Sequence, residues 1–272
     1  MLGETTFYFK WRIWMAADLI LTRKENRIGF ITLNRPEAMN TFIPEFADQL
    51  DAALWEMEND DEVKVVIINA AGKHFCTGIQ LDQFNNKSHG DYRKFLYGID
   101  AFYHTMAKMT KTTIAATHGY TLANGAGLAF AADLTVAAES TTFGTTAINV
   151  GLICLGPAAP MSKIIGRKKL IEMVLTGDMF SATEAEQFGL VTKVVPDDQL
   201  EAAALELAKK LVKKSSVALR IGKEGLNRLY EDAYDRKLDV MDDLFAAICA
   251  GGEAEEGVAA FLEKRAPNWK EC

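Results

Sequence analysis

TTIAATHGYTLANGAGLAFAADLTVAA, residues 112–138, carries the pattern that decides the fold. Its two ends, 112–118 and 133–138, are short apolar runs of the length expected for strands buried on both faces. A glycine-rich turn that opens a helix lies between them. A strand, a helix and a second strand in this order predict neighbouring parallel strands joined by a right-handed crossover.

The same alternation continues on both sides of this stretch. Further strands are predicted from β-rich or apolar runs at 18–23, 27–33, 63–70 and 190–195. The first two are separated by Glu25-Asn26 and predict a hairpin. Pro44 opens a helix with apolar residues at helical spacing, and a mixed helix is predicted at about 92–109. The sequence therefore predicts an α/β fold with a largely parallel sheet.

The β pattern ends near Pro196, and only helical periodicity follows. Four helices are predicted, near 197–213, 216–231, 234–249 and 253–264. We expect an α/β core over 15–195 and an all-helical region over 196–272. Residues 1–14 hold five aromatic residues among polar ones and lack the apolar core of a secretory signal, so we expect an N-terminal extension outside the fold.

Composition excludes several classes of protein. A chain of 272 residues with 49% hydrophobic and 25% charged residues is typical of one large globular domain. No run of about eighteen apolar residues occurs, so a membrane partner is not expected. The net charge of −7 argues against nucleic-acid binding. The four cysteines form no C-x-x-C pair and the histidines have no metal-ligand spacing, which predicts a reduced, cytoplasmic protein without a metal site.

Two loops rich in small residues follow buried strands, at 71–84 and 118–133. Ligands of α/β sheets bind at the carboxyl ends of strands, so these loops are the candidate site. Gly125 and Gly127 permit close backbone approach to a ligand, and a helix start offers unpaired N–H groups to an oxyanion or a phosphate. Tight helix–strand packing explains the same glycines equally well. No complete phosphate-loop motif is present.

Several motifs occur in one order along the chain: Asn34-Arg35-Pro36-Glu37 with Met39-Asn40, GKHFCTG (72–78), His118-Gly119-Tyr120 through Gly127 to Asp133, Phe143-Gly144 through Leu152, MVLTGD (173–178) and FLEKR (261–265). With these motifs the chain resembles the enoyl-CoA hydratase/isomerase family, the crotonase superfamily, from about Asp18 to Trp269. The resemblance implies a crotonase-like ββα spiral core with a C-terminal helical region that mediates trimers, which commonly pair as hexamers.

The resemblance also implies an acyl-CoA ligand and an oxyanion hole. In this family the thioester carbonyl oxygen accepts two backbone N–H bonds, which map to Ile79 and to Asn124, with Gly125 one place away. Such donors stabilise an enolate-like intermediate. No cofactor is implied beyond the coenzyme A of the substrate. Residues implied to lie near coenzyme A are Arg35, Lys73, Gln80, Leu81, Asp82 and Lys264. Those implied to line the acyl pocket are Asn149, Leu152, Cys154 and Leu155.

The chain departs from the family pattern at two positions. Family hydratases use two glutamates, because one must activate water while the other supplies a proton. The matching residues here are Gly127 and Ala147, and neither moves a proton. No other residue replaces them by motif. We interpret Cys154 as a small buried residue, His118 as a hydrogen-bonded structural imidazole, and Asp133 and Asp178 as turn or cap residues.

The resulting functional expectation is a lyase or isomerase of acyl-CoA, in the chemistry of fatty acid metabolism, that stabilises a thioester enolate. Decarboxylation of a malonyl-type thioester fits the missing acids best, because loss of CO₂ creates the enolate without a protein base. Hydration or isomerisation by other groups and thioester hydrolysis stay open. The alternative is a non-catalytic acyl-CoA-binding protein. An intact oxyanion loop would favour the enzyme, whereas a pocket filled by Leu152 or Leu155 would favour the binder.

Overall fold

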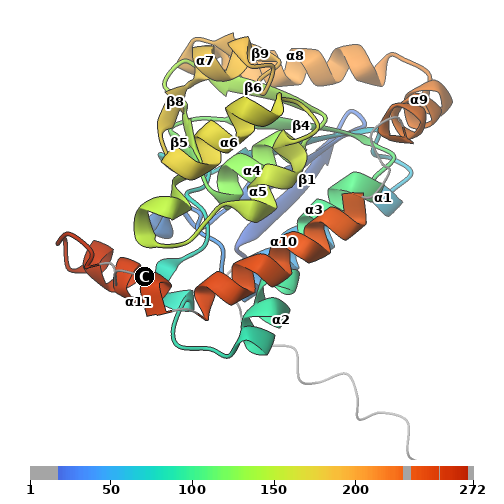
Figure 1. Cartoon of the computed structure of the whole chain (residues 1–272). Helices are drawn as coiled ribbons and strands as arrows, with labels where there is room; N and C mark the ends of the chain where they lie inside the picture. The colour runs from blue at the N-terminus through green and yellow to red at the C-terminus, as the bar shows by residue number, and fades with distance from the viewer. Residues whose placement is uncertain (1–17, 229–233, 251, 269–272) are drawn as a thin grey trace, which may run out of the picture.

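A six-stranded sheet organises the molecule in the computed structural model, which describes residues 18–228, 234–250 and 252–268 (Figure 1). The strand order is β1-β2-β3-β4-β6-β9, and all neighbours are parallel except β1 and β2. These strands span Ile20–Glu25, Ile28–Leu33, Val65–Ala70, Thr112–Thr117, Leu134–Ala138 and Lys193–Val195. The predicted largely parallel sheet and hairpin are confirmed. The predicted extension, residues 1–14, lies outside the described residues.

The hairpin between β1 and β2 turns on two residues. Glu25 pairs with Ile28, and Asn26 and Arg27 between them have φ of 51° and 66°. Two positive φ values in a two-residue loop are typical of a type I′ turn, whose twist matches that of the flanking strands.

The two faces of the sheet pack against different helices. Ile31, Val66 and Ala115 belong to the core cluster that includes α1 (Pro44–Asn59), α3 (Ala101–Lys108) and α4 (Asn124–Ala131). Phe30 and Ile114 point to the opposite face, where α8 (Leu200–Val212) covers them. Because side chains alternate along a strand, burial on both faces produces the continuous apolar runs seen in the sequence.

Three short strands form a second sheet in the order β5-β7-β8. They span Tyr120–Leu122, Thr142–Gly144 and Met179–Ser181. β5 follows β4 directly and leads into α4, and β7 follows β6 and leads through a 3₁₀ turn into α5 (Leu155–Met161). The chain thus repeats a ββα unit in which a long strand joins the main sheet and a short one joins the second sheet.

One predicted helix is wrong in its extent. The segment 92–109 is two helices, α2 (His89–Ile99) and α3, which meet at Asp100 with φ −95° and ψ 6°. Buried residues on both sides made the pattern look continuous. The remaining helices of the core are α6 (Arg167–Thr176) and α7 (Ala182–Gln187).

Beyond β9 the described chain is helical, with α8, α9 (Ser216–Arg228), α10 (Tyr234–Cys249) and α11 (Gly252–Leu262). α10 lies across the core against α2 and α5, and α11 contacts the 3₁₀ turn after β7 (Figure 1). α10 and α11 therefore cover the side of the core on which the loops after β3 and β4 lie. In the described ranges, no helix combines the length and apolar character needed to cross a membrane.

Candidate active site

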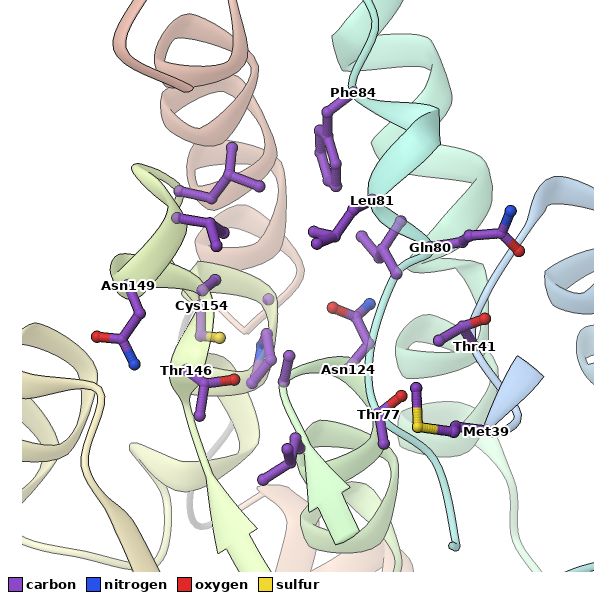
Figure 2. Close-up of a pocket in the computed structure, with 18 of the residues that line it drawn as sticks. Met39, Thr41, Thr77, Gln80, Leu81, Phe84, Asn124, Thr146, Asn149 and Cys154 are labelled. Carbon is purple, nitrogen blue, oxygen red and sulfur yellow. The ribbon is translucent and has the colours of Figure 1, made fainter. Parts of the chain in front are cut away.

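A cavity of about 740 Å³ lies between the loops that follow β3 and β4 and the C-terminal helices. Its wall is mostly apolar, and α10 and α11 contribute Phe245 and Phe261 to it. Figure 2 shows Thr146 and Cys154 on one side and Thr77 and Leu81 on the other, with Asn124 between them. The two loops predicted from the sequence as the candidate site therefore meet at one cavity.

Positive φ angles shape both loops immediately before the predicted oxyanion donors. Gly78 has φ 101° and precedes Ile79, and Ala123 has φ 47° with ψ −122° and precedes Asn124. Ala123 is strained, because a side chain disfavours this conformation, and such strain is found at functional sites. A Cβ built on Gly78 would lie 2.7 Å from the Ala123 Cβ and 3.7 Å from the Asn124 nitrogen. The two turns therefore pack directly on one another.

The backbone N–H groups of Ile79 and Asn124 are available to a ligand. Phe42 pairs with Ile79 by donating to Gly78 O and accepting from Gln80 N, which leaves the Ile79 N–H unused. Asn124 is the first residue of α4, where N–H groups have no intrahelical acceptor. Across the described residues neither N–H has a hydrogen-bond acceptor, and both residues line the cavity. Their role as donors stays a prediction.

Gly125 has a packing role. A Cβ at Gly125 would overlap the carbonyl oxygen of Cys76, so glycine permits α4 to begin against the loop after β3. Gly125 is not among the described residues that line the cavity, whereas its neighbour Asn124 is. The sequence explained this glycine equally well by helix packing or by ligand contact, and in the structure helix packing accounts for it.

Gly127 and Ala147, which stand where the resemblance implies glutamates, have different surroundings. A Cβ at Gly127 would overlap the phenol oxygen of Tyr103 and lie 3.1 Å from the Pro157 Cα. Ala147, by contrast, lines the cavity. The space beside residue 127 is filled by a tyrosine from α3, whereas the space beside residue 147 is open.

The residues predicted near coenzyme A divide into two groups. Arg35, Gln80 and Leu81 line the cavity. Arg35 donates from Nη1 to Thr41 Oγ1 at 2.8 Å and from Nη2 to Gln80 Oε1 at 2.5 Å, and Gln80 Nε2 donates to Asp82 Oδ2 at 2.5 Å. Asp82 therefore shapes this wall through Gln80. Lys73 and Lys264 are exposed and outside the cavity wall, Lys264 directly beyond α11.

Of the predicted pocket residues, Asn149, Leu152 and Cys154 line the cavity. Leu155 instead packs against the cluster around Phe84, because it begins α5 and turns toward the neighbouring helices. Leu152 is part of the wall and leaves the cavity open. Burial raises the pKa of the Cys154 thiol to about 12, so the thiol stays protonated and is a poor nucleophile near neutral pH.

The loop histidines make structural hydrogen bonds. His118 Nε2 lies 2.9 Å from Gly72 O. His74 Nδ1 accepts from the Tyr120 N–H at 3.1 Å and its ring stacks on Tyr120 with centroids 4.8 Å apart. Burial and the nearby Lys73 charge lower the pKa of His74. Both imidazoles therefore join the two loops, and neither is among the described residues that line the cavity.

Asp133 has a structural position as well. Its Oδ2 accepts from the Thr113 N–H at 2.7 Å and pairs with Lys223 Nζ at 2.7 Å, which joins β4 to α9. Asp178 follows α6 in an exposed turn. Within the described ranges, no three His, Cys, Asp or Glu side chains are arranged to hold a metal ion.

Sequence reasoning missed a buried acid in the cavity wall. Asp100, 4% exposed, lies where α2 meets α3, and its Oδ1 accepts from Asn124 Nδ2 at 2.7 Å. It is hydrogen-bonded to Asp242 of α10, which is 3% exposed. Among the described residues that line the cavity, Asp100 is the only carboxylic acid.

The two carboxyl groups affect each other's protonation. Burial, together with the negative charge of Asp242, raises the pKa of Asp100 well above its ordinary value. Burial raises the pKa of Asp242 to about 6. Two buried carboxylates in hydrogen-bond contact repel each other when both are ionised, so the surroundings favour a pair that holds one proton.

A sequence signal for Asp242 alone existed in α10. Asp242 shares the buried face of that helix with Phe245, Ala246 and Cys249, at the spacing of residues that face a core. A charged residue on an apolar helix face is unusual and marks a partner or a function.

Comparisons with known proteins find related sequences along most of the chain. The family model described as enoyl-CoA hydratase/isomerase matches residues 23–272. A probable enoyl-CoA hydratase of Mycobacterium bovis is 33% identical over 94% of this chain and 99% of its own length. The 1,2-epoxyphenylacetyl-CoA isomerase of Escherichia coli is 31% identical over 93% of this chain and 98% of its own.

The fold is shared with solved structures. An enoyl-CoA hydratase from Mycobacterium avium subsp. paratuberculosis superposes with a TM-score of 0.85 and 26% identity, over 93% of this chain and 99% of that chain. The likeness confirms the predicted crotonase-like α/β fold, with its ββα spiral core and C-terminal helices.

Proposed function

This chain belongs to the enoyl-CoA hydratase/isomerase family, whose members are enzymes that process acyl-CoA thioesters. We propose that it stabilises a thioester enolate with the backbone N–H groups of Ile79 and Asn124. The observation that carries the proposal is the pair of unused N–H groups on adjoining turns at the wall of an open cavity. A thioester oxygen held by both would gain charge-stabilising hydrogen bonds as the enolate forms. The loss of one such donor costs on the order of 3 kcal/mol in other enzymes.

Coenzyme A recognition is proposed at the side of the cavity formed by Arg35, Gln80 and Leu81. Arg35 supplies the positive charge that a phosphate or pyrophosphate requires. Its hydrogen bonds to Thr41 and Gln80 hold the guanidinium against the wall, so little side-chain entropy remains to be lost on binding. Lys73 and Lys264, both exposed, are proposed to contact the nucleotide outside the cavity.

Decarboxylation of a malonyl-type thioester is the reaction that we propose. The bond between the α-carbon and the carboxylate carbon breaks, its electron pair forms the enolate held by the two N–H groups, and CO₂ leaves. The mostly apolar wall of the cavity supports this step, because a carboxylate is poorly solvated there and its loss as neutral CO₂ is favoured. The step requires neither of the acids missing at positions 127 and 147.

A non-catalytic acyl-CoA binder fits the structure less well. Leu152 leaves the cavity open instead of filling it, and the strained turn at Ala123 retains a conformation of the kind found at functional sites. No cofactor beyond the coenzyme A of the substrate enters the proposal. Assembly as a homotrimer or a dimer of trimers and a cytoplasmic location stay predictions.

The test is a panel of acyl-CoA thioesters incubated with the full chain in deuterated water and analysed by mass spectrometry. The panel contains methylmalonyl-CoA, crotonyl-CoA and butyryl-CoA. We expect CO₂ loss from methylmalonyl-CoA to give deuterated propionyl-CoA, whereas binding without any change in the thioesters would contradict the proposal and favour the binder. Hydrated crotonyl-CoA would instead assign hydration.

A cavity-filling variant serves as the matched control for this assay. Ala147→Phe places a ring in the open space beside residue 147 and should remove turnover without unfolding the protein. Ala202→Phe makes the same change on the exposed face of α8 and should leave turnover unchanged. Equal activity of the two variants would show that the reaction occurs elsewhere.

A further inference from the structure

Asp100 has the position of a proton-transfer group in the cavity. It ends α2 and begins α3, with a backbone conformation between the helical and extended regions, where active-site residues are often found. Its carboxyl group reaches the cavity past Gly156, where an added Cβ would lie 2.7 Å from Asp100 Oδ2. Glycine at 156 therefore keeps a path open between the carboxyl group and the cavity.

Asn124 connects this acid to the predicted oxyanion hole. The Asn124 side chain donates to Asp100 Oδ1 at 2.7 Å, while its backbone N–H is the predicted donor to the thioester oxygen. In a thioester the α-carbon is bonded to the carbonyl carbon. A substrate with its carbonyl oxygen at the Asn124 N–H therefore has its α-carbon two bonds from that oxygen, in the cavity whose wall includes Asp100.

A second acid supports the first from the C-terminal helices. Asp242 is buried, is hydrogen-bonded to Asp100, and has its Oδ2 without a partner among the described residues. A buried acid with an unsatisfied oxygen destabilises the fold, and such a cost is retained at functional sites.

We propose that Asp100 and Asp242 form a carboxyl pair that transfers the proton at the α-carbon of the bound thioester, with Asp100 as the residue that touches the substrate and Asp242 as its positioning partner. The inference rests on the proposed function, because it requires an enolate in the cavity. It deepens that function by identifying an acid in a chain that lacks glutamate at positions 127 and 147.

Proton transfer by the pair balances in both directions. After CO₂ leaves, the enolate α-carbon takes the proton of Asp100, so a C–H bond forms, the O–H bond breaks and its electron pair stays on the carboxylate. Solvent water then returns a proton to the pair. In the reverse sense, ionised Asp100 removes an α-proton from a saturated acyl-CoA and leaves the enolate. A pair that holds one proton serves as acid and as base.

The charged surroundings of the pair come from every helix packed against it. The other titratable or charged groups that face it are Arg93 on α2, Tyr103 and His104 on α3, Cys154 at the start of α5 and Asp239 on α10. The Asp242 charge is the largest charge effect on Asp100 and raises its pKa. Removal of that charge should lower the pH at which Asp100 becomes a base.

The test is exchange of the α-hydrogens of butyryl-CoA for deuterium, because this exchange is enolate formation and reprotonation without another reaction. Asp100→Asn retains the shape and the hydrogen bond from Asn124 but cannot transfer the proton. We expect it to reduce exchange by about 100-fold or more, while coenzyme A affinity changes little. Asp242→Asn should keep exchange but shift its pH midpoint to lower pH. Asp198→Asn, an exposed aspartate in the 3₁₀ turn before α8 and outside the cavity wall, is the control and should leave exchange unchanged.

Each result separates the two proposals. Exchange by Asp100→Asn equal to that of the parent protein would overturn the pair, because a merely structural aspartate would be replaced without loss. Absence of exchange in the parent protein would overturn it too, while CO₂ loss from methylmalonyl-CoA in the same preparation would leave the proposed function standing. If Asp100→Asn fails to fold, as judged by circular dichroism, an unshifted pH midpoint in Asp242→Asn decides against the pair.

Discussion

The surroundings of Gly127 and Ala147 differ, although both residues stand where the resemblance implies a glutamate. At Gly127 the phenol of Tyr103 fills the place of a side chain, and the Pro157 backbone also lies close to it. At Ala147 the cavity itself lies beside the methyl group. Packing therefore leaves no room for an acidic side chain at position 127. At position 147 there is room, and an acid is absent only because the residue is alanine. Asp100 supplies a carboxyl group to the cavity wall that includes Ala147.

The largest expected effect tests this contrast in stability. Gly127→Glu forces a side chain into the Tyr103 phenol and buries a carboxyl group, and we expect the free energy of unfolding to fall by about 3 kcal/mol or more. Ala147→Glu has room in the cavity, and a loss of about 1 kcal/mol is expected. Denaturant unfolding of both variants measures the difference. Equal losses would show that the two positions are packed alike.

The next effect concerns the free energy of unfolding that the protein loses when buried Asp242 ionises. The folded-state pKa of Asp242 is about 6, above its ordinary value of 3.8, so its stabilising contribution is complete below pH 4 and is lost as the pH rises through 6. Asparagine at position 242 cannot ionise, so Asp242→Asn should not lose this stability as the pH rises. Relative to the parent protein, the variant should gain on the order of 2 kcal/mol in free energy of unfolding between pH 4 and pH 7.5.

Urea unfolding at the two pH values measures this gain. Asp198→Asn serves as the control, because it removes the same charge from an exposed side chain in the 3₁₀ turn before α8. A difference between Asp242→Asn and the parent that does not change with pH would contradict the raised pKa and weaken the case for a pair that holds one proton.

The smallest effect is a coupling between Gly127 and Tyr103. Gly127→Ala should destabilise the protein, because the new methyl group meets the phenol oxygen. In a Tyr103→Phe background this oxygen is absent, although the ring carbon remains 2.8 Å from the methyl position. We expect the loss caused by Gly127→Ala to shrink by about 1 kcal/mol in that background. A double-mutant cycle measures the coupling, and additive losses would mean that Tyr103 does not close the position.

The parts of the fold that could be predicted are those with a local pattern. Strands buried on both faces leave continuous apolar runs, and helices on the surface of the core leave an apolar stripe. β5, β7 and β8 were missed, because three residues are too few for a pattern and pairing across the second sheet alone defines them. The break at Asp100 was missed for a related reason: buried residues continue through it.

The candidate site could be predicted only in part. Gly78, Ile79 and Asn124 lie in contiguous motifs, so the sequence placed both predicted donors on loops that do meet. Asp100 and Asp242 belong to no motif and come from helices far apart in the chain. Neither spacing nor residue type indicated that they would contact each other.

The sequence by itself determined the family, the alternation of strands and helices, the two loops and the residue types at 127 and 147. These are properties of short segments, in which neighbouring residues act together through backbone geometry and periodic burial. Only the tertiary structure decided that Tyr103 closes one position, that Ala147 opens on a cavity, and that two buried acids meet beside Asn124. Such contacts depend on how α3, α4 and α10 pack, and packing is set by the shape of the whole core rather than by any one segment.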